Sequence, residues 1–153
     1  MADLSFSDLL LFVPVDRSGE EFAIASQIRP TTGQTLYQDD HVGLRVSDID
    51  RPLVASAYGR AEVIEGEVPI KPTNRRASVM CIPIRHEDQI IGVLSRELLP
   101  NFAELRDPGE LERTYLEAFH QLAKMIAAGT FPYQDNEVDL EQVPRVGYGM
   151  LVI

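Results

Sequence analysis

The sequence predicts an α+β domain of the α/β sandwich type, in which helices flank a central antiparallel β-sheet and a long helix follows the strands. Two pairs of apolar, strand-length runs are each joined by a short polar segment, which is typical of β-hairpins. A later segment repeats its apolar residues with the period of an α-helix. The chain has 153 residues, of which 44% are hydrophobic, and therefore suffices for one domain with its own core.

The first hairpin is predicted near the N-terminus. Residues 9–15 and 21–28 are apolar runs, and the turn-forming tetrapeptide 16–19 separates them. Residues 2–8 are expected to form a short helical turn that leads into the first strand. Pro14 cannot donate a backbone hydrogen bond, so we expect it at an edge position or a bulge.

A short helix and a weaker strand are predicted between the two hairpins. The helix is expected to begin after Asp50 as N-cap and to continue through Tyr58. Pro52 suits the first helical turn, and Gly59 favours a stop. Residues 62–70 are compatible with a strand, although the run contains a glycine and a proline.

The second hairpin is the clearest pattern in the chain. Residues 78–85 and 89–96 are almost continuously apolar and flank the tripeptide His86-Glu87-Asp88. Strands of this kind are covered on both faces, so helices are expected on both sides of the sheet. Cys81, the single cysteine, lies in this apolar run, which favours a buried thiol over the alternative of a redox sensor.

The longest helix is predicted after residue 107. Asp107 is a suitable N-cap, Pro108 a suitable first residue and Glu110 a capping-box partner. Gly129 provides a stop. One apolar stripe recurs at spacings of four, four, three and four residues: Leu111, Tyr115, Phe119, Leu122 and Ile126. Leu116, Ala123 and Met125 widen this stripe, which leaves both a sheet contact and a dimer contact open.

The composition of the C-terminal part predicts the domain organisation. Residues 1–131 are expected to form one sensory-type domain, residues 132–143 an acidic linker, and residues 144–153 the truncated start of a following domain. The last four residues are apolar and strand-like, and we expect a natural chain to continue beyond them.

Charge and motifs exclude several functions. A net charge of -10 disfavours nucleic acid and anionic lipid as partners. No apolar run approaches the roughly 20 residues of a membrane helix, and the N-terminus does not resemble a secretory signal, so a cytoplasmic location is expected. Phosphate-binding, dinucleotide-binding and zinc motifs are absent, and the three histidines lie far apart. We therefore predict no catalytic residues and no metal site.

A ligand site is the remaining candidate. Residues 29–43 form a polar loop that could cover a pocket, although an ordinary connecting loop is the alternative. Arginines of the second hairpin could attract a phosphate or carboxylate, or could form surface ion pairs instead. The candidate ligand-binding residues are Arg29, Thr32, Tyr37, His41, Arg75, Arg76 and Cys81.

Six segments together resemble one known family. They are ADLSFSDLLLFV, QIRPTTGQTLYQDDHVG, RPLVASAY, HEDQIIGVLSRE, LERTYLEAFHQLAKMIAAGTFP and PRVGYGMLVI. Jointly they are similar to the N-terminal GAF-like domain of cytosolic sensor histidine kinases of actinobacteria, in which GAF, PAS and kinase domains follow one another. The last segment resembles the start of the PAS domain, with Tyr148 where relatives tend to have an acidic residue.

The resemblance implies a GAF-like fold and a role as a non-catalytic input domain of a two-component system. Such a domain would bind a small molecule or another cytoplasmic signal and pass it to the PAS and kinase domains. A structural dimerisation module without a ligand is the alternative. The resemblance further implies a homodimer, a response regulator as phosphorylation partner, and ATP and Mg as cofactors of the parent kinase, with none in this segment. A GAF-fold sulfoxide reductase is disfavoured because its chemistry requires a second cysteine.

Overall fold

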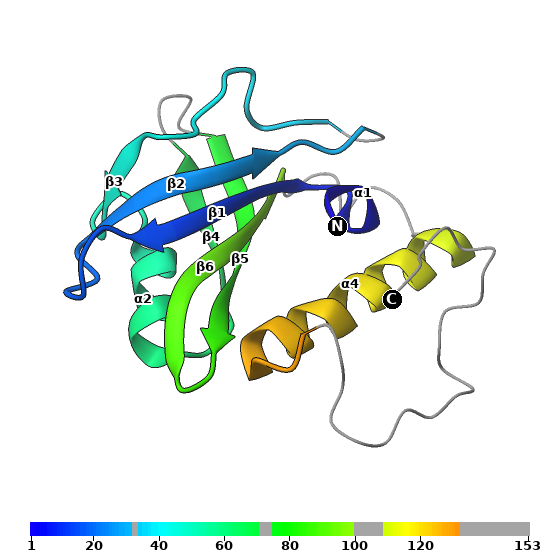
Figure 1. Ribbon diagram of the computed structural model, residues 1–153. Coiled ribbons are helices and arrows are strands. Elements are labelled where there is room, and N and C mark those ends of the chain that lie inside the picture. The colour runs from blue at the N-terminus through cyan, green and yellow to red at the C-terminus, as the bar shows by residue number, and fades with distance from the viewer. Residues whose placement is uncertain (32–33, 71–74, 100–108, 132–153) are drawn as a thin grey trace.

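The computed structural model describes residues 1–31, 34–70, 75–99 and 109–131. The predicted linker at 132–143 and the predicted start of a second domain at 144–153 lie outside these residues. Within them, six strands form one antiparallel sheet in the order β3-β2-β1-β6-β5-β4 (Figure 1). The strands are β1 (Asp8–Pro14), β2 (Glu21–Ile28), β3 (Arg45–Ser47), β4 (Ile64–Ile70), β5 (Arg75–His86) and β6 (Gln89–Leu98). The helices are α1 (Ala2–Ser5), α2 (Pro52–Arg60) and α4 (Glu110–Ala128). The predicted fold class is confirmed.

Both predicted hairpins are present, and the pairing of β1 with β6 joins them into one sheet. The pairing of β1 with β2 shifts register between Leu11 and Phe12, because β2 has a bulge with Ala25 as its extra residue. Pro14 is therefore not itself a bulge residue. The pairing of β1 with β6 ends at Phe12, so the missing N–H of Pro14 faces no partner strand on that side.

Two elements at the edges of the sheet differ in how well the sequence predicted them. The strand expected over 62–70 is present as β4, which pairs with β5 from Ile64 to Ile70. The three-residue strand β3 was not predicted. It pairs with β2 through only three residues, and a run of that length is too short to show a period.

The prediction for α2 was wrong at both ends. Arg51 is the N-cap residue, and the Asp50 carboxylate instead accepts a hydrogen bond from the Ser47 hydroxyl at 2.9 Å. The helix passes through Gly59 and ends at Arg60, and its C-cap Ala61 adopts the left-handed conformation at φ 55°. Gly59 does not adopt the left-handed conformation through which glycine ends helices, and Ala61 adopts it instead.

The start of α4 also differs from the prediction. Gly109 is the N-cap, and its N–H donates to Glu112 Oε2 at 2.9 Å, so Glu112 occupies the capping-box position assigned to Glu110. Asp107 and Pro108 lie outside the described residues. The predicted stop is confirmed, because Gly129 adopts φ 76° at the C-terminal end.

The sheet has one hydrophobic cluster on each face. The cluster under α2 is the larger and contains Leu10, Phe12, Phe22, Ile24, Tyr37, Val54, Ala57, Ala77, Val79, Cys81 and Val93. The cluster on the opposite face contains Ala2, Leu9, Ile82, Phe119 and Ala123, contributed by α1, the sheet and α4. Helices therefore cover both faces, as the apolar runs of the second hairpin predicted.

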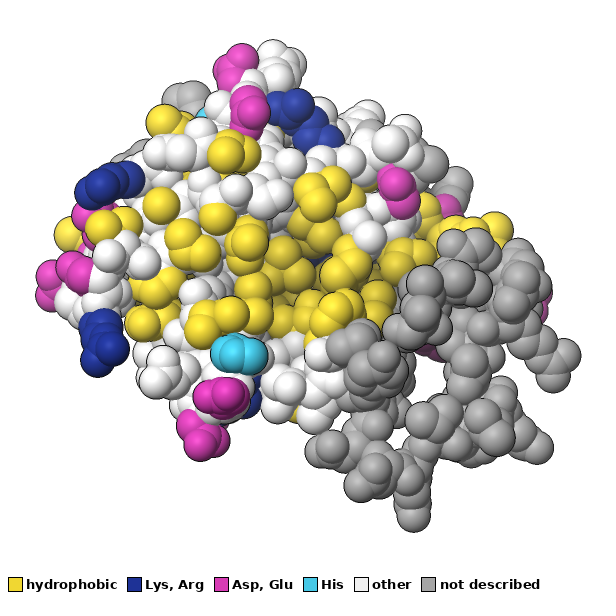
Figure 2. Space-filling model, in the orientation of Figure 1, with side chains coloured by type: hydrophobic (Ala, Val, Ile, Leu, Met, Phe, Trp, Pro, Cys, Tyr) yellow, Lys and Arg dark blue, Asp and Glu magenta, His cyan; other side chains and the backbone are white. Residues whose placement is uncertain are grey.

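The long helix uses only part of its apolar stripe against the sheet. Phe119 is fully buried, whereas Leu111 is 54% exposed. α4 lies beside β5 and α1 lies at the start of β1, so no described helix covers the rest of β1 and β2 on that face (Figure 1). Leu11 and Val13 point to this face, and Figure 2 shows an apolar area over these strands next to α4. None of the described helices is both long and apolar enough to cross a membrane.

Two glycines should respond oppositely to alanine. A Cβ at Gly92 would lie 2.7 Å from the Phe12 carbonyl oxygen, whereas a Cβ at Gly59 meets nothing within 4 Å. We expect Gly92→Ala to lower the free energy of unfolding by about 1–3 kcal/mol, because a backbone atom must move. Gly59→Ala should raise it by about 0.5–1 kcal/mol. Urea denaturation measures both, and equal effects would contradict the assigned close contact of β1 and β6.

Candidate functional site

The beginning of α2 directs a charged side chain into the interior. Arg51 Nη1 donates to Glu97 Oε1 at 2.9 Å, and Arg51 Nη2 donates to the Tyr37 hydroxyl at 3.0 Å. The guanidinium carbon lies 5.4 Å from the centre of the Phe12 ring, within range of a cation–π interaction. The Arg51 side chain is only 14% exposed. Arg51 thus links the helix, the 34–44 segment and the central strand β6.

Glu97 is the centre of a buried polar network. Its side chain is fully buried, and its Oε2 accepts the hydrogen bond of the Tyr37 hydroxyl. Its Oε1 also accepts the Ser95 hydroxyl at 2.8 Å, and Cys81 Sγ lies 3.9 Å from that hydroxyl. Ser95 and Glu97 are two residues apart on β6, so both point to the α2 face of the sheet. The network therefore extends from Arg51, at the start of α2, to the buried thiol of Cys81.

The charges of this network compensate one another. Burial alone would lower the pKa of Arg51, but Glu97 and Tyr37 together raise it above its usual value. Burial, followed by the neighbouring Glu97 carboxylate, raises the pKa of Tyr37. Arg51 is therefore a cation and Tyr37 a neutral donor over the physiological pH range. A buried ion pair of this kind is well satisfied only while both partners are present.

A second buried carboxylate anchors the loop that borders the site. Asp8 lies opposite Glu97 in the pairing of β1 with β6. Asp8 Oδ1 accepts the Thr35 hydroxyl at 2.7 Å, and Oδ2 accepts the Leu36 N–H at 2.6 Å. Burial raises the pKa of Asp8, the nearby Glu97 raises it further, and the two hydrogen bonds oppose this shift. These bonds fix the residues that precede Tyr37 and so hold its side chain in position.

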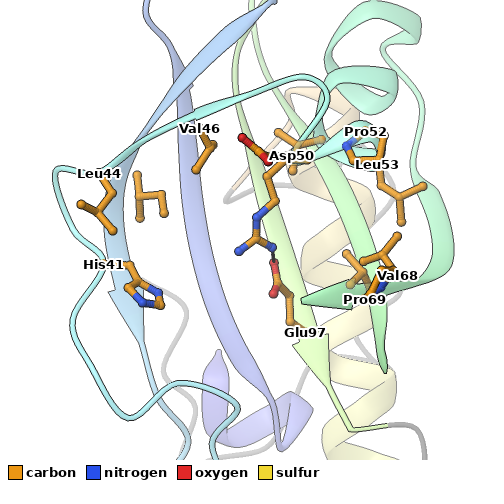
Figure 3. Close-up of a pocket in the computed structure, with 13 residues that line it drawn as sticks. His41, Leu44, Val46, Asp50, Pro52, Leu53, Val68, Pro69 and Glu97 are labelled. Carbon is orange, nitrogen blue, oxygen red and sulfur yellow. Dashed lines mark hydrogen bonds and ion pairs between the residues drawn. The ribbon is translucent and has the colours of Figure 1, made fainter. Parts of the chain in front are cut away.

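A half-open cavity of about 350 Å³ lies above the network, between the β2–β3 side of the sheet and α2 (Figure 3). His41, Leu44 and Val46 lie on one side, and Pro52, Leu53, Val68 and Pro69 on the other, with Glu97 between them. The remaining lining residues are Ile24, Asp50, Arg51, Val54 and Val79. The walls are mainly apolar, and the charged groups are few and close together, an arrangement that is usual for small-molecule sites.

Three of the residues predicted from sequence lie at or beside this cavity. His41 lines it, and its ring packs edge-on against Tyr37 with centroids 5.0 Å apart. Tyr37 forms part of the polar network. Arg29 braces the same loop, because its Nε donates to the Tyr37 carbonyl oxygen at 2.9 Å.

The other predicted residues lie elsewhere or are not described. Cys81 is buried, contacts the network through Ser95 and does not line the cavity. Arg76 forms an exposed ion pair with Glu67 at 3.3 Å, the surface role that was the alternative for the hairpin arginines. Thr32 and the side chain of Arg75 lie outside the described parts of the structure.

Sequence reasoning missed Arg51, Glu97 and Asp8. One signal could have found Glu97: Val93, Ser95 and Glu97 alternate along β6, so a carboxylate occupies a position of the core-facing set. No comparable sequence signal marks Arg51. It lies just before a helix, a position at which many arginines are exposed to solvent. Among the described residues, no group of three histidine, cysteine, aspartate or glutamate side chains is arranged to hold a metal ion.

Cys81 should be unreactive in the folded protein. Burial raises the pKa of its thiol to about 12. At pH 8 the thiolate fraction would then be about 10⁻⁴ of the total, and the sulfur is also inaccessible. We expect labelling by a disulfide reagent at pH 8 to be slow in buffer and fast in urea, followed by absorbance. Rapid labelling of the folded protein would instead support the redox-sensor alternative.

Comparisons with known proteins agree with this fold. Residues 1–119 match the family described as the GAF domain of histidine kinase PdtaS. Sensor histidine kinase PdtaS of Mycobacterium tuberculosis (strain H37Rv) is 35% identical over 99% of this chain, and that of Mycolicibacterium smegmatis is 32% identical over 99%. The chain spans 30% of the length of these curated relatives.

Solved structures give the same result. The sensor region of a sensor histidine kinase superposes with a TM-score of 0.64 and 34% identity, over 86% of this chain and 43% of that chain. An IclR transcriptional regulator from Alicyclobacillus acidocaldarius has a TM-score of 0.50 and 12% identity, over 84% of this chain and 63% of that chain, and shares the fold alone. The chain is thus a sensor-type domain and not a kinase catalytic domain, and it belongs to the family of GAF domains found in the histidine kinase PdtaS.

Proposed function

We propose that this domain is the sensory input domain of a cytoplasmic sensor histidine kinase and that it binds a small molecule in the cavity beside α2. The observation that carries the proposal is the half-open cavity of about 350 Å³ with the Arg51–Glu97 pair at its base. Its volume lies within the range of small-ligand pockets, and a buried charge pair next to apolar walls provides orientation as well as contact.

The sheet offers a route from the cavity to the long helix. Glu97 points to the cavity, and the preceding residue Arg96 points to the opposite face. Arg96 Nη2 donates to the Ser5 carbonyl oxygen at 3.1 Å, and its guanidinium carbon lies 5.5 Å from the centre of the Phe119 ring on α4. A displacement of β6 by a ligand would therefore alter the contacts of α1 and α4.

We propose the remainder of the pathway from the resemblance to sensor histidine kinases. In the parent chain, α4 would pass the signal to a PAS domain and to a kinase domain that uses ATP and Mg to phosphorylate a response regulator. The parent is expected to act as a homodimer.

Ligand binding in the cavity can be tested with one variant that fills the cavity and one control variant that does not. Leu44 lines the cavity and is 52% exposed, so Leu44→Trp can fill its mouth without disturbing the core. Ile49 is 85% exposed and does not line the cavity, which makes Ile49→Trp the matched control. A ligand present at 100 times its dissociation constant should stabilise the wild type by about 2.7 kcal/mol.

The measurement is a thermal-shift screen of cytoplasmic metabolites. We expect at least one compound to raise the melting temperature of the wild type and of Ile49→Trp but not of Leu44→Trp. If no compound has an effect, or if all three proteins respond equally, the cavity is not the sensory site.

Self-association is the second candidate function, and the apolar area over β1 and β2 favours it (Figure 2). Ile28 is 54% exposed and lies opposite Leu9, on the α4 side of the sheet. Ile28→Glu should therefore dissociate a dimer that uses this area, while Ile49→Glu should not. Sedimentation velocity distinguishes the two, and a wild type that is monomeric at high concentration removes this candidate. Phe119 is unsuitable for the test because it is fully buried.

A further inference from the structure

The cavity walls restrict the chemical class of its ligand. Most of the surface comes from aliphatic side chains, among them Ile24, Val46, Val54, Val68 and Val79. Polar or highly charged molecules would lose hydration on entering without finding partners along these walls. The bulk of a ligand that fits this cavity is therefore apolar.

The base of the cavity offers donors rather than acceptors. A guanidinium group carries five N–H bonds. Among the described residues, Arg51 uses two of them, one toward Glu97 and one toward Tyr37. The acceptor oxygens beside it are already engaged, because Glu97 Oε1 accepts from Arg51 and Ser95 and Glu97 Oε2 accepts from Tyr37. A ligand group that reaches Arg51 meets N–H bonds that have no partner among the described residues, and a hydrogen-bond acceptor is the group that can use them.

The local charge disfavours an anion. Glu97 is fully buried and already neutralises Arg51 at 2.9 Å. A carboxylate or phosphate placed against Arg51 would lie close to the Glu97 carboxylate, which lines the same cavity. Like charges that close together in a poorly hydrated site repel strongly. An uncharged acceptor avoids this repulsion and keeps the benefit of a charge-assisted hydrogen bond.

We propose that the cavity binds an uncharged, mainly apolar molecule through one carbonyl-type acceptor that receives a hydrogen bond from Arg51. This inference rests on the proposed function and specifies the ligand class of that site. The Arg51–Glu97 pair then acts as a charge-neutral donor: Glu97 repels a carboxylate, and an ammonium group has no acceptor for the N–H bonds of Arg51.

Four probes with one ring and different polar groups test the class. They are acetophenone, benzoate, benzylamine and ethylbenzene, titrated into the 153-residue chain while the methyl signals of Leu53 and Val68 are followed by NMR. Both residues line the cavity, so their shifts locate the binding. We expect acetophenone to bind at least about tenfold more tightly than each of the other three, because only it provides an uncharged acceptor.

Two variants test the role of the ion pair. Glu97→Gln keeps an acceptor oxygen for Arg51 but removes the compensating charge, so benzoate affinity should rise by about tenfold relative to the wild type. Arg51→Lys keeps the charge but loses the planar set of donors, and the preference for acetophenone over ethylbenzene should disappear. Arg45→Lys is the matched control, because Arg45 pairs with Glu21 at the surface and does not line the cavity.

The possible outcomes separate this inference from the proposed function. If benzoate or benzylamine shifts the Leu53 and Val68 methyls at the lowest concentration, the cavity is a binding site but the proposed ligand class is wrong. Equal affinities of acetophenone and ethylbenzene would overturn the role of Arg51. If none of the four probes shifts these methyls at millimolar concentration, the proposed function itself fails. Should Glu97→Gln not fold, the comparison of Arg51→Lys with Arg45→Lys still decides whether Arg51 holds the acceptor.

Discussion

Replacing Arg51 with methionine is expected to lower the free energy of unfolding by about 3–5 kcal/mol, because it leaves the fully buried Glu97 without its counter-charge. The loss is increased by Asp8, whose buried carboxyl lies opposite Glu97 on the neighbouring strand. Methionine preserves much of the arginine stem, so the change isolates the charge and its hydrogen bonds. Urea denaturation followed by circular dichroism provides the measurement.

Two further variants show whether the ion pair is the cause. Arg45 forms an exposed pair with Glu21 at 3.5 Å, and Arg45→Met should cost no more than about 1 kcal/mol. In the double variant Arg51→Met with Glu97→Gln, the buried charge is absent, and much of the stability should return. A loss for Arg51→Met as small as that for Arg45→Met would show that Glu97 is hydrated in solution.

Phe119→Ala is the second change with a large expected effect. Phe119 is fully buried between α4 and the sheet, and its removal leaves a cavity that the backbone cannot close. We expect a loss of about 3–5 kcal/mol in the free energy of unfolding. The same change removes the ring beneath the Arg96 guanidinium and so weakens the contact between β6 and α4.

Leu111→Ala is the matched control on the same helix. Leu111 belongs to the same apolar stripe but is 54% exposed, so its truncation should change the stability by no more than about 0.5 kcal/mol. Thermal and urea unfolding of both variants measure the difference. If Leu111→Ala proved as damaging as Phe119→Ala, the N-terminal part of α4 would have to be packed against another surface in solution.

The hairpins and the long helix were predictable because their signals are local. An apolar run such as 89–96, next to a turn, indicates a strand wherever that strand is finally placed. The ends of the helices were predicted less well. Asp50 and Asp107 have suitable side chains for caps, but Arg51 and Gly109 occupy the N-cap positions of α2 and α4. Where a helix begins depends on the tertiary contacts of its first turn as well as on the capping preference.

The candidate site could be predicted only in part. The polar loop indicated Tyr37 and His41, since loop side chains of these types often bind ligands. Arg51 and Glu97 are separated by 46 residues, and nothing in their immediate neighbours points to a pair. Arg76 and Cys81 were chosen for their chemistry, yet Arg76 lies in a surface ion pair and Cys81 is buried without lining the cavity.

The sequence by itself determined the α+β class, the two hairpins, the long helix and the resemblance to GAF-like domains of actinobacterial sensor histidine kinases, because periodicity and motif content are properties of consecutive residues. Only the tertiary structure decided that β1 pairs with β6, which brings Asp8 opposite Glu97, and that the start of α2 directs Arg51 onto that carboxylate. The physical reason is that a buried charge is tolerated only beside its partner, and that partner is brought there by the packing of α2 on the sheet and not by proximity along the chain.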